Sequence, residues 1–439
     1  MLKDKIVKTI RTFSPVNLWL NKVKCEGDIV HIGNCKIKRS EIEKISLFGI
    51  GKCASQQISG LLDTMESLGV SSRFKQIVSL TKQNHSITDI RLTQYEGDHP
   101  VVSRKSTEAT RCFLSHFNEV KRGERVIFFI SGGASSVFES QIEGVSLSRL
   151  QELNKYLLSS GRGIREINCV RKVLSRIKNG GVLELIVGSP IYAFLSSDVP
   201  GNEVEIIGSG PLFYSDQKWE EVFASIPMER FLGVTYEQLG TRIKESEVRK
   251  KEFQARSILE WEYFVTPEMV LDQLVAELEL DQERVISTGV FDGSIDELMS
   301  LQIEKIEKCR KEKGLGSVCL ISGGEGTVVV GDVRGCGGRN SHFVLAMAMR
   351  LIDHFRGAPC QFEIASIGSD GTDGSNQVAG AYWDLSVERV ARRKGLNPRS
   401  YLESFDSLSF FQQLGYEVNT GATGLNVMDL RAIKLKFQI

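Results

Sequence analysis

Short apolar runs alternate with longer amphipathic segments in the first half of the chain, and this alternation restricts the fold more than any other feature. The apolar runs have the length of buried strands and lie at residues 45–48, 75–80, 125–130 and 191–196. The segments between them have the pattern of helices and cover residues 56–68, 106–120 and 148–158. Strand–helix alternation is typical of a parallel sheet covered on both faces. We therefore predict an α/β fold, with its site in the loops that follow the carboxyl ends of the strands.

The second half of the chain resumes the alternation after a charged, helical stretch at residues 216–262. Strands are predicted at 284–289, 316–321 and 361–367, with a hairpin arm at 326–331 and helices at 296–313 and 340–355. The chain has 439 residues, which is more than one compact core usually holds. We place the domain boundary in the charged stretch and expect domains at 1–240 and 241–439.

The composition excludes several classes of protein. Hydrophobic residues make up 41% and charged residues 25%, as in ordinary globular proteins. The formal net charge is zero, so the chain lacks the basic excess that nucleic-acid-binding proteins usually carry. No uncharged apolar run approaches the roughly 20 residues that span a bilayer, and the first residues lack the apolar region of a secretory signal. Nine cysteines occur without a CxxC pair, as expected for reduced thiols. We expect a cytoplasmic protein without a membrane or nucleic-acid partner.

Four glycine-rich stretches lie far apart in the sequence. They are "FGIGKCAS" (48–55), "ISGGASS" (130–136), "ISGGEGTVVV" (321–330) and "RGCGGRN" (334–340). Each of the first three follows a strand-like run, where glycine lets backbone amides face a ligand without a Cβ in the way. A helix beginning there adds a positive dipole end. With Lys52 and Arg339 inside two of these stretches, the pattern favours a phosphorylated ligand, although a tight turn also explains any single one.

The first of these stretches fits neither common nucleotide loop well. A Walker A loop needs glycine six residues before the lysine and Ser or Thr after it, but Ser46 and Cys53 occupy those positions. The pattern Gly49-x-Gly51-x-x-Ala54 fits a dinucleotide fingerprint loosely. The acidic residue that would bind the ribose is missing, because the next strand ends in Thr81-Lys82. This disfavours NAD and leaves NADP open.

Acidic residues follow two of the other predicted strands. Asp198 comes after the 191–196 run, and Asp370 and Asp373 lie three apart among glycines. Carboxylates at strand ends suit Mg²⁺ binding or general-base catalysis, whereas aspartates in glycine turns also cap those turns. The six histidines show no metal spacing, and no G-x-S-x-G elbow indicates a nucleophilic serine.

Together, the motifs resemble a known family nearly from end to end. In order they are "GIGKCAS", "GDHPV", "ISGGASS", "INCVRKVLSRIKNGG", "SSDVPGNEVEIIGSGP", "ISGGEGTVVV", "GCGGRNSHFVLA", "SDGTDGSNQVAGA" and "TGATGLNVMDL". The sequence that carries them resembles the glycerate 2-kinases of the MOFRL type, a family sometimes labelled hydroxypyruvate reductase.

The resemblance implies two three-layer α/β/α domains with the active site in the cleft between them. The N-terminal domain would be Rossmann-like with a mostly parallel sheet, and the C-terminal domain would have a mixed sheet. The implied reaction transfers the γ-phosphoryl group of ATP to the 2-hydroxyl of D-glycerate with Mg²⁺. The implied partners are these small molecules, in a monomer or homodimer.

The resemblance also implies roles for particular residues. The family's charged cleft positions match Lys52, Asp198 and Arg339 as catalytic residues, and Arg171 as a residue near the substrate. The expected phosphate- or substrate-binding residues are Gly51, Ser131, Gly132, Gly133, Ser135, Gly323, Gly324, Glu325 and Asn340. The expected metal ligands are Asp198, Asp370 and Asp373.

The sequence departs from the family pattern at several positions, which leaves other functions open. Ala134 replaces a glycine, Ser341-His342 replaces a Gln-Glu pair, and Leu425 stands where threonine is common. The departures at Ala134, Ser294 and Ser341 motivate one alternative to the kinase, a ligand-binding protein without turnover. The Gly49-x-Gly51-x-x-Ala54 stretch motivates the other, an NAD(P)H-dependent hydroxypyruvate reductase.

Overall fold

The chain forms two compact units in a computed structural model that describes residues 1–160, 162, 164–233, 235–281, 284–312, 316–330, 335–356, 360–374 and 376–437. The N-terminal unit comprises Pro15–Phe264, and the C-terminal unit comprises Met1–Ser14 together with Val265–Ile439. Helix α10 (Tyr236–Arg256) runs through residue 240. The boundary expected after residue 240 falls inside this helix. The compact units have bounds other than the domains expected at 1–240 and 241–439.

A six-stranded sheet forms the centre of the N-terminal unit, with the strand order β6-β5-β4-β7-β8-β9. The strands are β4 (Ser46–Ile50), β5 (Gln76–Lys82), β6 (Thr93–Gly97), β7 (Val126–Ile130), β8 (Ile191–Ser196) and β9 (Leu259–Val265). Strands β6, β5, β4, β7 and β8 pair in parallel. The four strands predicted here are β4, β5, β7 and β8, and the mostly parallel sheet is confirmed.

Apolar side chains on both faces of this sheet explain why it is covered on both sides. Phe128 packs against Phe48 and Phe117 on one face, whereas its neighbour Phe129 stacks on Phe194 on the other. Successive strand residues point to opposite faces, so a continuous apolar run needs two layers of cover. Helix α4 (Arg104–Ser115) covers the first face through Phe113, and Trp19 of α2 (Pro15–Lys22) contacts Phe129 on the second.

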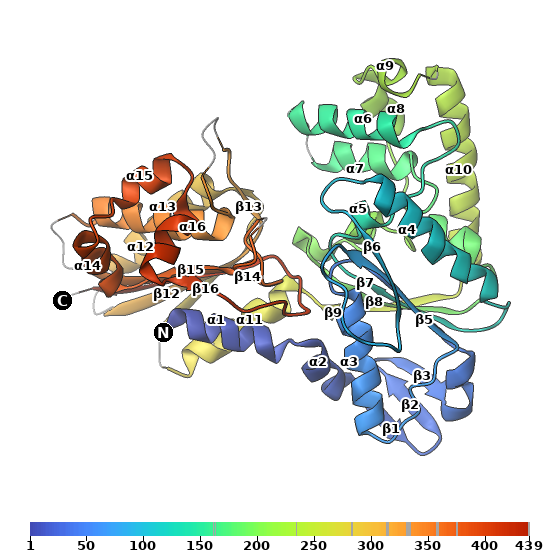
Figure 1. The fold of residues 1–439 in the computed structure, drawn as a ribbon, viewed down its shortest axis with the longest axis horizontal. Coiled ribbons are helices and arrows are strands. Elements are labelled where there is room, and N and C mark those ends of the chain that lie inside the picture. Colours follow the sequence, from blue (N-terminus) through green and yellow to red (C-terminus); the bar gives the residue numbers. More distant parts are fainter. Residues whose placement is uncertain are drawn as a thin grey trace. The chain divides into compact units, whose positions relative to one another are not determined.

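Further elements complete the N-terminal unit. The helices are α3 (Ala54–Ser67), α5 (Ala134–Val137), α6 (Leu147–Ser159), α7 (Ile164–Val173), α8 (Trp219–Ala224) and α9 (Met228–Leu232), with 3₁₀ helices η1 (Arg39–Lys44), η2 (His116–Glu119), η3 (Gly181–Leu185), η4 (Pro200–Asn202) and η5 (Ile207–Ser209). A small antiparallel sheet consists of β1 (Val23–Glu26), β2 (Ile29–Ile32) and β3 (Cys35–Lys38). Helices α6 to α10 surround an apolar cluster of their own (Figure 1), so the charged stretch around α10 is a packed part of this unit.

The C-terminal unit has a mixed sheet with the strand order β10-β12-β17-β14-β15-β16. Its strands are β10 (Val285–Val290), β12 (Ser317–Gly324), β14 (Cys360–Gly368), β15 (Gly380–Trp383), β16 (Glu417–Val418) and β17 (Asp429–Phe437). Only β10 and β12 pair in parallel, while β17 pairs antiparallel with both β12 and β14. The predicted mixed sheet is confirmed. The hairpin arm predicted at 326–331 is wrong in its described part, because β13 (Gly326–Thr327) pairs in parallel with β11 (Gly293–Ser294); Gly331 lies outside the described residues.

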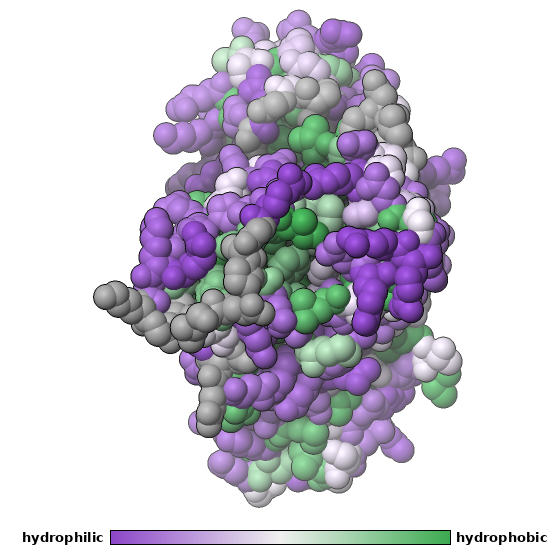
Figure 2. Space-filling model, turned by 90° about the vertical axis from the view of Figure 1, so that its left-hand side faces the viewer, coloured by the Kyte–Doolittle hydropathy of each residue, from purple (hydrophilic) through white to green (hydrophobic). Residues whose placement is uncertain are grey.

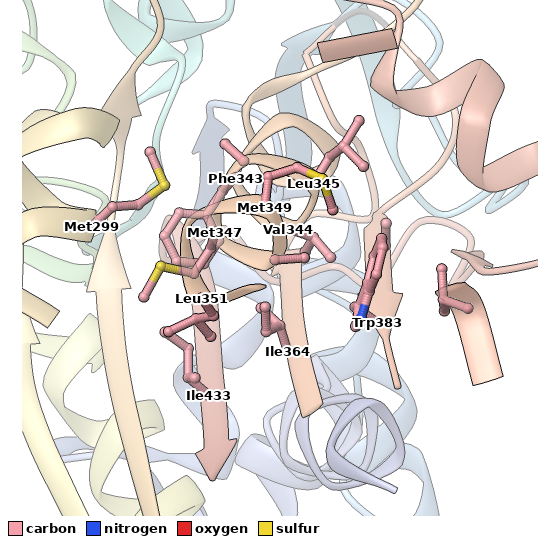
Figure 3. Packing of buried hydrophobic residues seen from close by; sticks show 14 of the residues in the cluster. Met299, Phe343, Val344, Leu345, Met347, Met349, Leu351, Ile364, Trp383 and Ile433 are labelled. Carbon is pink, nitrogen blue, oxygen red and sulfur yellow. The ribbon is translucent and has the colours of Figure 1, made fainter. Parts of the chain in front are cut away.

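Helices lie on both faces of the mixed sheet. They are α1 (Leu2–Thr12), α11 (Pro267–Glu279), α12 (Ile295–Arg310), α13 (Arg339–His354), α14 (Leu385–Arg393), α15 (Pro398–Glu403) and α16 (Ser407–Leu414). Helices α1 and α11 contact the sheet on one side, and α12 and α13 on the other (Figure 1). Figure 3 shows Phe343, Met347 and Leu351 of α13 close to Ile364 and Ile433 of the sheet. This is the three-layer arrangement that the α/β prediction requires.

The surface and the helices agree with the composition. Hydrophilic residues predominate on the face that Figure 2 shows, with hydrophobic residues among them. Among the described residues, no helix combines the length and the apolar content that a bilayer crossing requires.

Candidate active site

Lys52 lies in a tight turn between β4 and α3 that is bonded to its neighbours. The amide of Lys52 donates to Gly132 O (2.9 Å), that of Cys53 to Ser131 Oγ (3.1 Å), and that of Gly51 to Leu80 O (3.0 Å). Gly51 has φ +116°, and a Cβ there would lie 2.3 Å from Ser131 O. Glycine is therefore required so that the two loops can approach, and the amides of this turn hold Lys52 in place rather than binding an anion.

The 131–136 loop lies directly beside Lys52. Gly133 has φ +80°, and a Cβ on it would lie 2.9 Å from Lys52 Cγ and 3.2 Å from His99 Cδ2. Among the described residues, the structure gives no acceptor for the amides of residues 132–135, while the Ser135 hydroxyl pairs with Ser209 Oγ at 2.8 Å. Unused amides next to a lysine are a suitable environment for an anion.

The alanine that departs from the family pattern does not narrow this loop. Ala134 is buried in the apolar cluster that also contains Ile50 and Ile130. A Cβ built on Gly208 would lie 2.9 Å from the Ala134 Cβ, so the extra methyl group occupies the space that Gly208 leaves. The substitution is therefore compatible with a binding role for the loop.

Asp198 lies at the same edge of the sheet. It follows β8 by two residues and is half-buried, and β8 is the parallel neighbour of β7, after which the 131–136 loop begins. The carboxyl ends of parallel neighbours meet at one edge. The structure thus brings Gly51, Lys52, Ser131, Gly132, Gly133, Ser135 and Asp198 to the edge formed by β4, β7 and β8.

Arg171 is placed on α7 rather than in one of these loops. Its Nε donates to Asn154 Oδ1 at 3.3 Å. Burial lowers the pKa of the Arg171 guanidinium, and the charge of Glu139 opposes this effect. Glu139 also forms a buried ion pair with Lys178. The substrate-binding role of Arg171 stays a prediction.

In the C-terminal unit, Arg339 begins helix α13 and is held by two carboxylates. Its Nε donates to Asp429 Oδ2 at 2.6 Å, and its Nη2 donates to Glu325 Oε1 at 2.7 Å and to Asp429 Oδ1 at 3.3 Å. Burial disfavours the charge on Arg339, but Asp429 and Glu325 outweigh this effect and raise its pKa. Arg339 therefore remains a cation with a defined orientation.

Asp373 caps the helix that carries Arg339. Its Oδ1 accepts from the amide of Asn340 (2.8 Å) and its Oδ2 from the amide of Ser341 (2.9 Å). Burial raises the pKa of the Asp373 carboxyl, and these amide bonds oppose the shift. A carboxylate at a helix N-terminus is stabilised by the helix dipole. The geometry gives Asp373 a structural role, and a metal ion would have to share oxygens that already accept these amides.

The other predicted residues of this unit have simple local explanations. Gly323 and Gly324 lie within β12, opposite Leu430 and Asp429 of β17. Gly324 has φ +117°, and a Cβ there would lie 2.0 Å from Phe291 O, so glycine is required by the backbone. Asp370 Oδ1 accepts from Thr372 N (2.9 Å) and Thr372 Oγ1 (2.7 Å).

The structure contains no ready-made metal cluster among its described residues. No group of three His, Cys, Asp or Glu side chains in the described ranges could hold a metal ion. The carboxylates of Asp198 and Asp370 are of the type that Mg²⁺ binds, usually with the oxygens of a bound phosphate. Their role as metal ligands stays a prediction.

A cavity of about 570 Å³ opens beside Arg339. Its lining includes Glu325, Val328, His342 and Phe405. The His342 ring stacks on Phe405 at 5.3 Å between centroids, and burial lowers the His342 pKa, opposed by Asp296. His342, one of the two residues that depart from the family pattern here, therefore lines a space of the size that small ligands occupy.

Asp429 is the partner of Arg339 that sequence reasoning did not single out. It is completely buried and contacts Arg339, Asn340 and Arg431. A signal was present, since Asp429 and Arg431 lie two residues apart in a run that also contains Leu430, Ala432 and Ile433. Buried charges need partners, so Asp429 and Arg431 in one buried strand indicate a buried ion pair.

Comparisons with known proteins agree with this arrangement. The sequence model described as "Domain of unknown function (DUF4147)" matches residues 1–234, and that of the MOFRL family matches residues 318–429. D-glycerate 2-kinase of Thermotoga maritima is 29% identical over 411 residues, covering 90% of this chain and 91% of that protein. A putative hydroxypyruvate reductase of Agrobacterium vitis is 31% identical over 397 residues, covering 88% and 98%.

A solved structure gives the same result for the fold. The crystal structure of glycerate kinase from Thermotoga maritima has a TM-score of 0.75 and 27% identity, covering 100% of this chain and 99% of that one. The predicted resemblance is confirmed over both units. The chain belongs to the glycerate 2-kinase family of the DUF4147 and MOFRL type, a family of phosphotransferase enzymes.

Proposed function

We propose that this protein is an ATP-dependent kinase that transfers the γ-phosphoryl group to the 2-hydroxyl of D-glycerate and releases 2-phosphoglycerate. The observation that supports the proposal is the arrangement in the N-terminal unit, where Lys52 lies beside the amides of residues 132–135, which have no acceptor among the described residues. The names of the relatives, D-glycerate 2-kinase among them, support the same reaction.

The residues suit phosphoryl transfer, which depends on positioning and charge stabilisation more than on covalent chemistry. Lys52 and Arg339 each supply positive charge to phosphate or carboxylate oxygens. The 2-hydroxyl oxygen forms the new bond to the γ-phosphorus, the bond to the β–γ bridging oxygen breaks, and ADP leaves. Asp198 is the carboxylate that accepts the hydroxyl proton or holds Mg²⁺. Asp198 would hold Mg²⁺, whose charge would neutralise that of the phosphate oxygens, and the role of Asp370 as a metal ligand stays a prediction. We place the reaction in the cytoplasm.

The proposal is tested by incubating the purified protein with ATP, Mg²⁺ and D-glycerate. Phosphorus NMR distinguishes 2-phosphoglycerate from its 3-phospho isomer, and a coupled assay for ADP gives the rate. A panel of related hydroxy acids identifies the preferred acceptor. A folded protein that phosphorylates none of these acids would overturn the proposal.

A hydroxypyruvate reductase is the second candidate, because two relatives in Agrobacterium vitis carry that name as a putative function. A dinucleotide site would use the amides of the turn after β4 for the pyrophosphate. Here the amides of Gly51, Lys52 and Cys53 donate to Leu80, Gly132 and Ser131. NAD(P)H absorbance with hydroxypyruvate tests this reaction, and we expect no oxidation.

ATP binding by calorimetry without turnover would instead indicate a family member that only binds its ligand.

A further inference from the structure

A row of buried polar side chains crosses the mixed sheet beneath helices α12 and α13. Arg431 of β17 lies opposite Ser322 of β12 and Ser366 of β14, so the three side chains share one face of the sheet. All three are completely buried. Buried polar side chains lose their hydration, so such a row destabilises a core unless hydrogen bonds compensate for that loss.

Helical residues bond to both ends of this row. Gln302 of α12 donates through Nε2 to Ser322 Oγ at 3.1 Å, and Ser366 Oγ donates to Asn340 Oδ1 of α13 at 2.5 Å. Asn340 Nδ2 then donates to Asp429 Oδ1 at 2.9 Å. The row therefore reaches the carboxylate that holds Arg339.

The Asp429 carboxylate is saturated by these neighbours. Its Oδ2 accepts from Arg339 Nε at 2.6 Å and from Arg431 Nη2 at 2.9 Å, and its Oδ1 accepts from Asn340 and from Arg339 Nη2. A carboxylate bound on all sides has no freedom to rotate. The orientation of Arg339 is thus determined by Asp429, and that of Asp429 in part by Arg431.

Arg431 is poorly satisfied as a structural residue. Its Nε and Nη1 have no hydrogen-bond partner in the described structure, although the side chain is completely buried. Its guanidinium lies 5.4 Å from the Phe343 ring, which compensates for only part of the lost hydration. Removing Arg431 would leave Asp429 paired with Arg339 and Asn340, so no buried charge would be left alone.

We propose that Arg431 is a positioning residue for phosphoryl transfer, which acts through Asp429 to hold the Arg339 guanidinium and keep its positive charge available to the substrate. This inference rests on the proposed kinase function. Without Arg431, Arg339 is the one cation among these residues that pairs with the carboxylates of Asp429 and Glu325. The net charge of these four side chains then falls by one, which weakens their attraction for an anionic substrate. Arg431 would thus reduce stability while supporting activity, a trade-off that functional sites show.

The test compares Arg431→Met, Arg339→Ala and the double variant. We expect Arg431→Met to unfold at or above the wild-type temperature, because methionine fills similar volume without the cost of burying a charge. Its kcat/KM should fall about tenfold or more through misplacement of Arg339. In the Arg339→Ala background, the same substitution should change kcat/KM less than about twofold, because the interactions are not independent.

Two results would overturn the proposal. One is an equal loss of kcat/KM from Arg431→Met in both backgrounds. The other is a loss of activity that only follows a lower melting temperature, as a structural role predicts.

NMR of protein with nitrogen-15-labelled arginine gives a readout independent of turnover. We expect the Arg339 Nε–H signal to be protected from exchange in the wild type and exposed in Arg431→Met. If the wild type phosphorylates no acid, the proposed function fails, while an unchanged Arg339 signal in the variant overturns the positioning role by itself.

Discussion

Replacing Gly133 by alanine tests whether the 131–136 loop positions Lys52. Gly133 has φ +80°, and its new Cβ would lie 2.9 Å from Lys52 Cγ. Carbon atoms in contact are usually about 3.5–4.0 Å apart, so Lys52 would have to move by about 1 Å. A displacement of that size at a catalytic group can cost up to about 10²-fold in rate. We therefore expect the kcat/KM of Gly133→Ala to fall by tens of fold.

The stability cost of the same substitution can be separated from its effect on Lys52. An alanine in the left-handed region costs roughly 1–2 kcal/mol, which lowers the melting temperature by about 2–8 °C for a unit of this size. Gly123 is the matched control, because it has φ +87° and nothing within 4 Å of an added Cβ. Gly123→Ala should show the same thermal shift with wild-type kinetics. If kcat/KM of both variants stayed within about threefold of wild type, the loop would not position Lys52 for the reaction.

Three further predictions follow from the described contacts. Lys52→Ala should lower kcat/KM about 10²-fold with an unchanged circular dichroism spectrum, and a change below about threefold would remove Lys52 from the mechanism. Lys178→Met should cost about 3–5 kcal/mol in denaturant unfolding because it leaves Glu139 buried and unpaired. Lys308→Met removes an exposed pair and should leave the unfolding midpoint close to that of wild type, and similar losses for the two variants would contradict this prediction. Burial lowers the Lys250 pKa to about 8. The unfolded state then binds more protons between about pH 8 and 10.5, so wild type should gain roughly 3 kcal/mol relative to Lys250→Met as pH rises through that window, and parallel profiles would contradict this.

In the N-terminal unit, the strands that sequence reasoning identified are those with apolar residues on both faces. Runs such as Val126–Ile130 are buried throughout, and their alternation with helices predicts a parallel sheet. The edge strands β6 and β9 were missed because half-exposed residues such as Glu96 and Glu262 interrupt their apolar pattern. The central place of β17 depends on pairing with distant strands, which local patterns do not contain.

The candidate site shows the same division between local and distant information. Glycine next to Lys52 marks a turn in which Gly51 lets Ser131 approach the backbone, and a phosphate-binding role for Gly51 stays a prediction. Asp429 was missed because its importance comes from Arg339, ninety residues away in sequence, and Arg431. Sequence patterns indicate residue types that suit a chemistry, whereas the partner of each residue follows from tertiary pairing.

The most direct test of the proposed function is the product formed by purified wild-type protein from ATP, Mg²⁺ and D-glycerate. We predict that phosphorus NMR will show 2-phosphoglycerate and ADP in equal amounts, and that Lys52→Ala and Arg339→Ala will each lower the rate about 10²-fold. A folded wild-type protein that yields no phosphorylated product from glycerate or any related hydroxy acid would contradict the assignment.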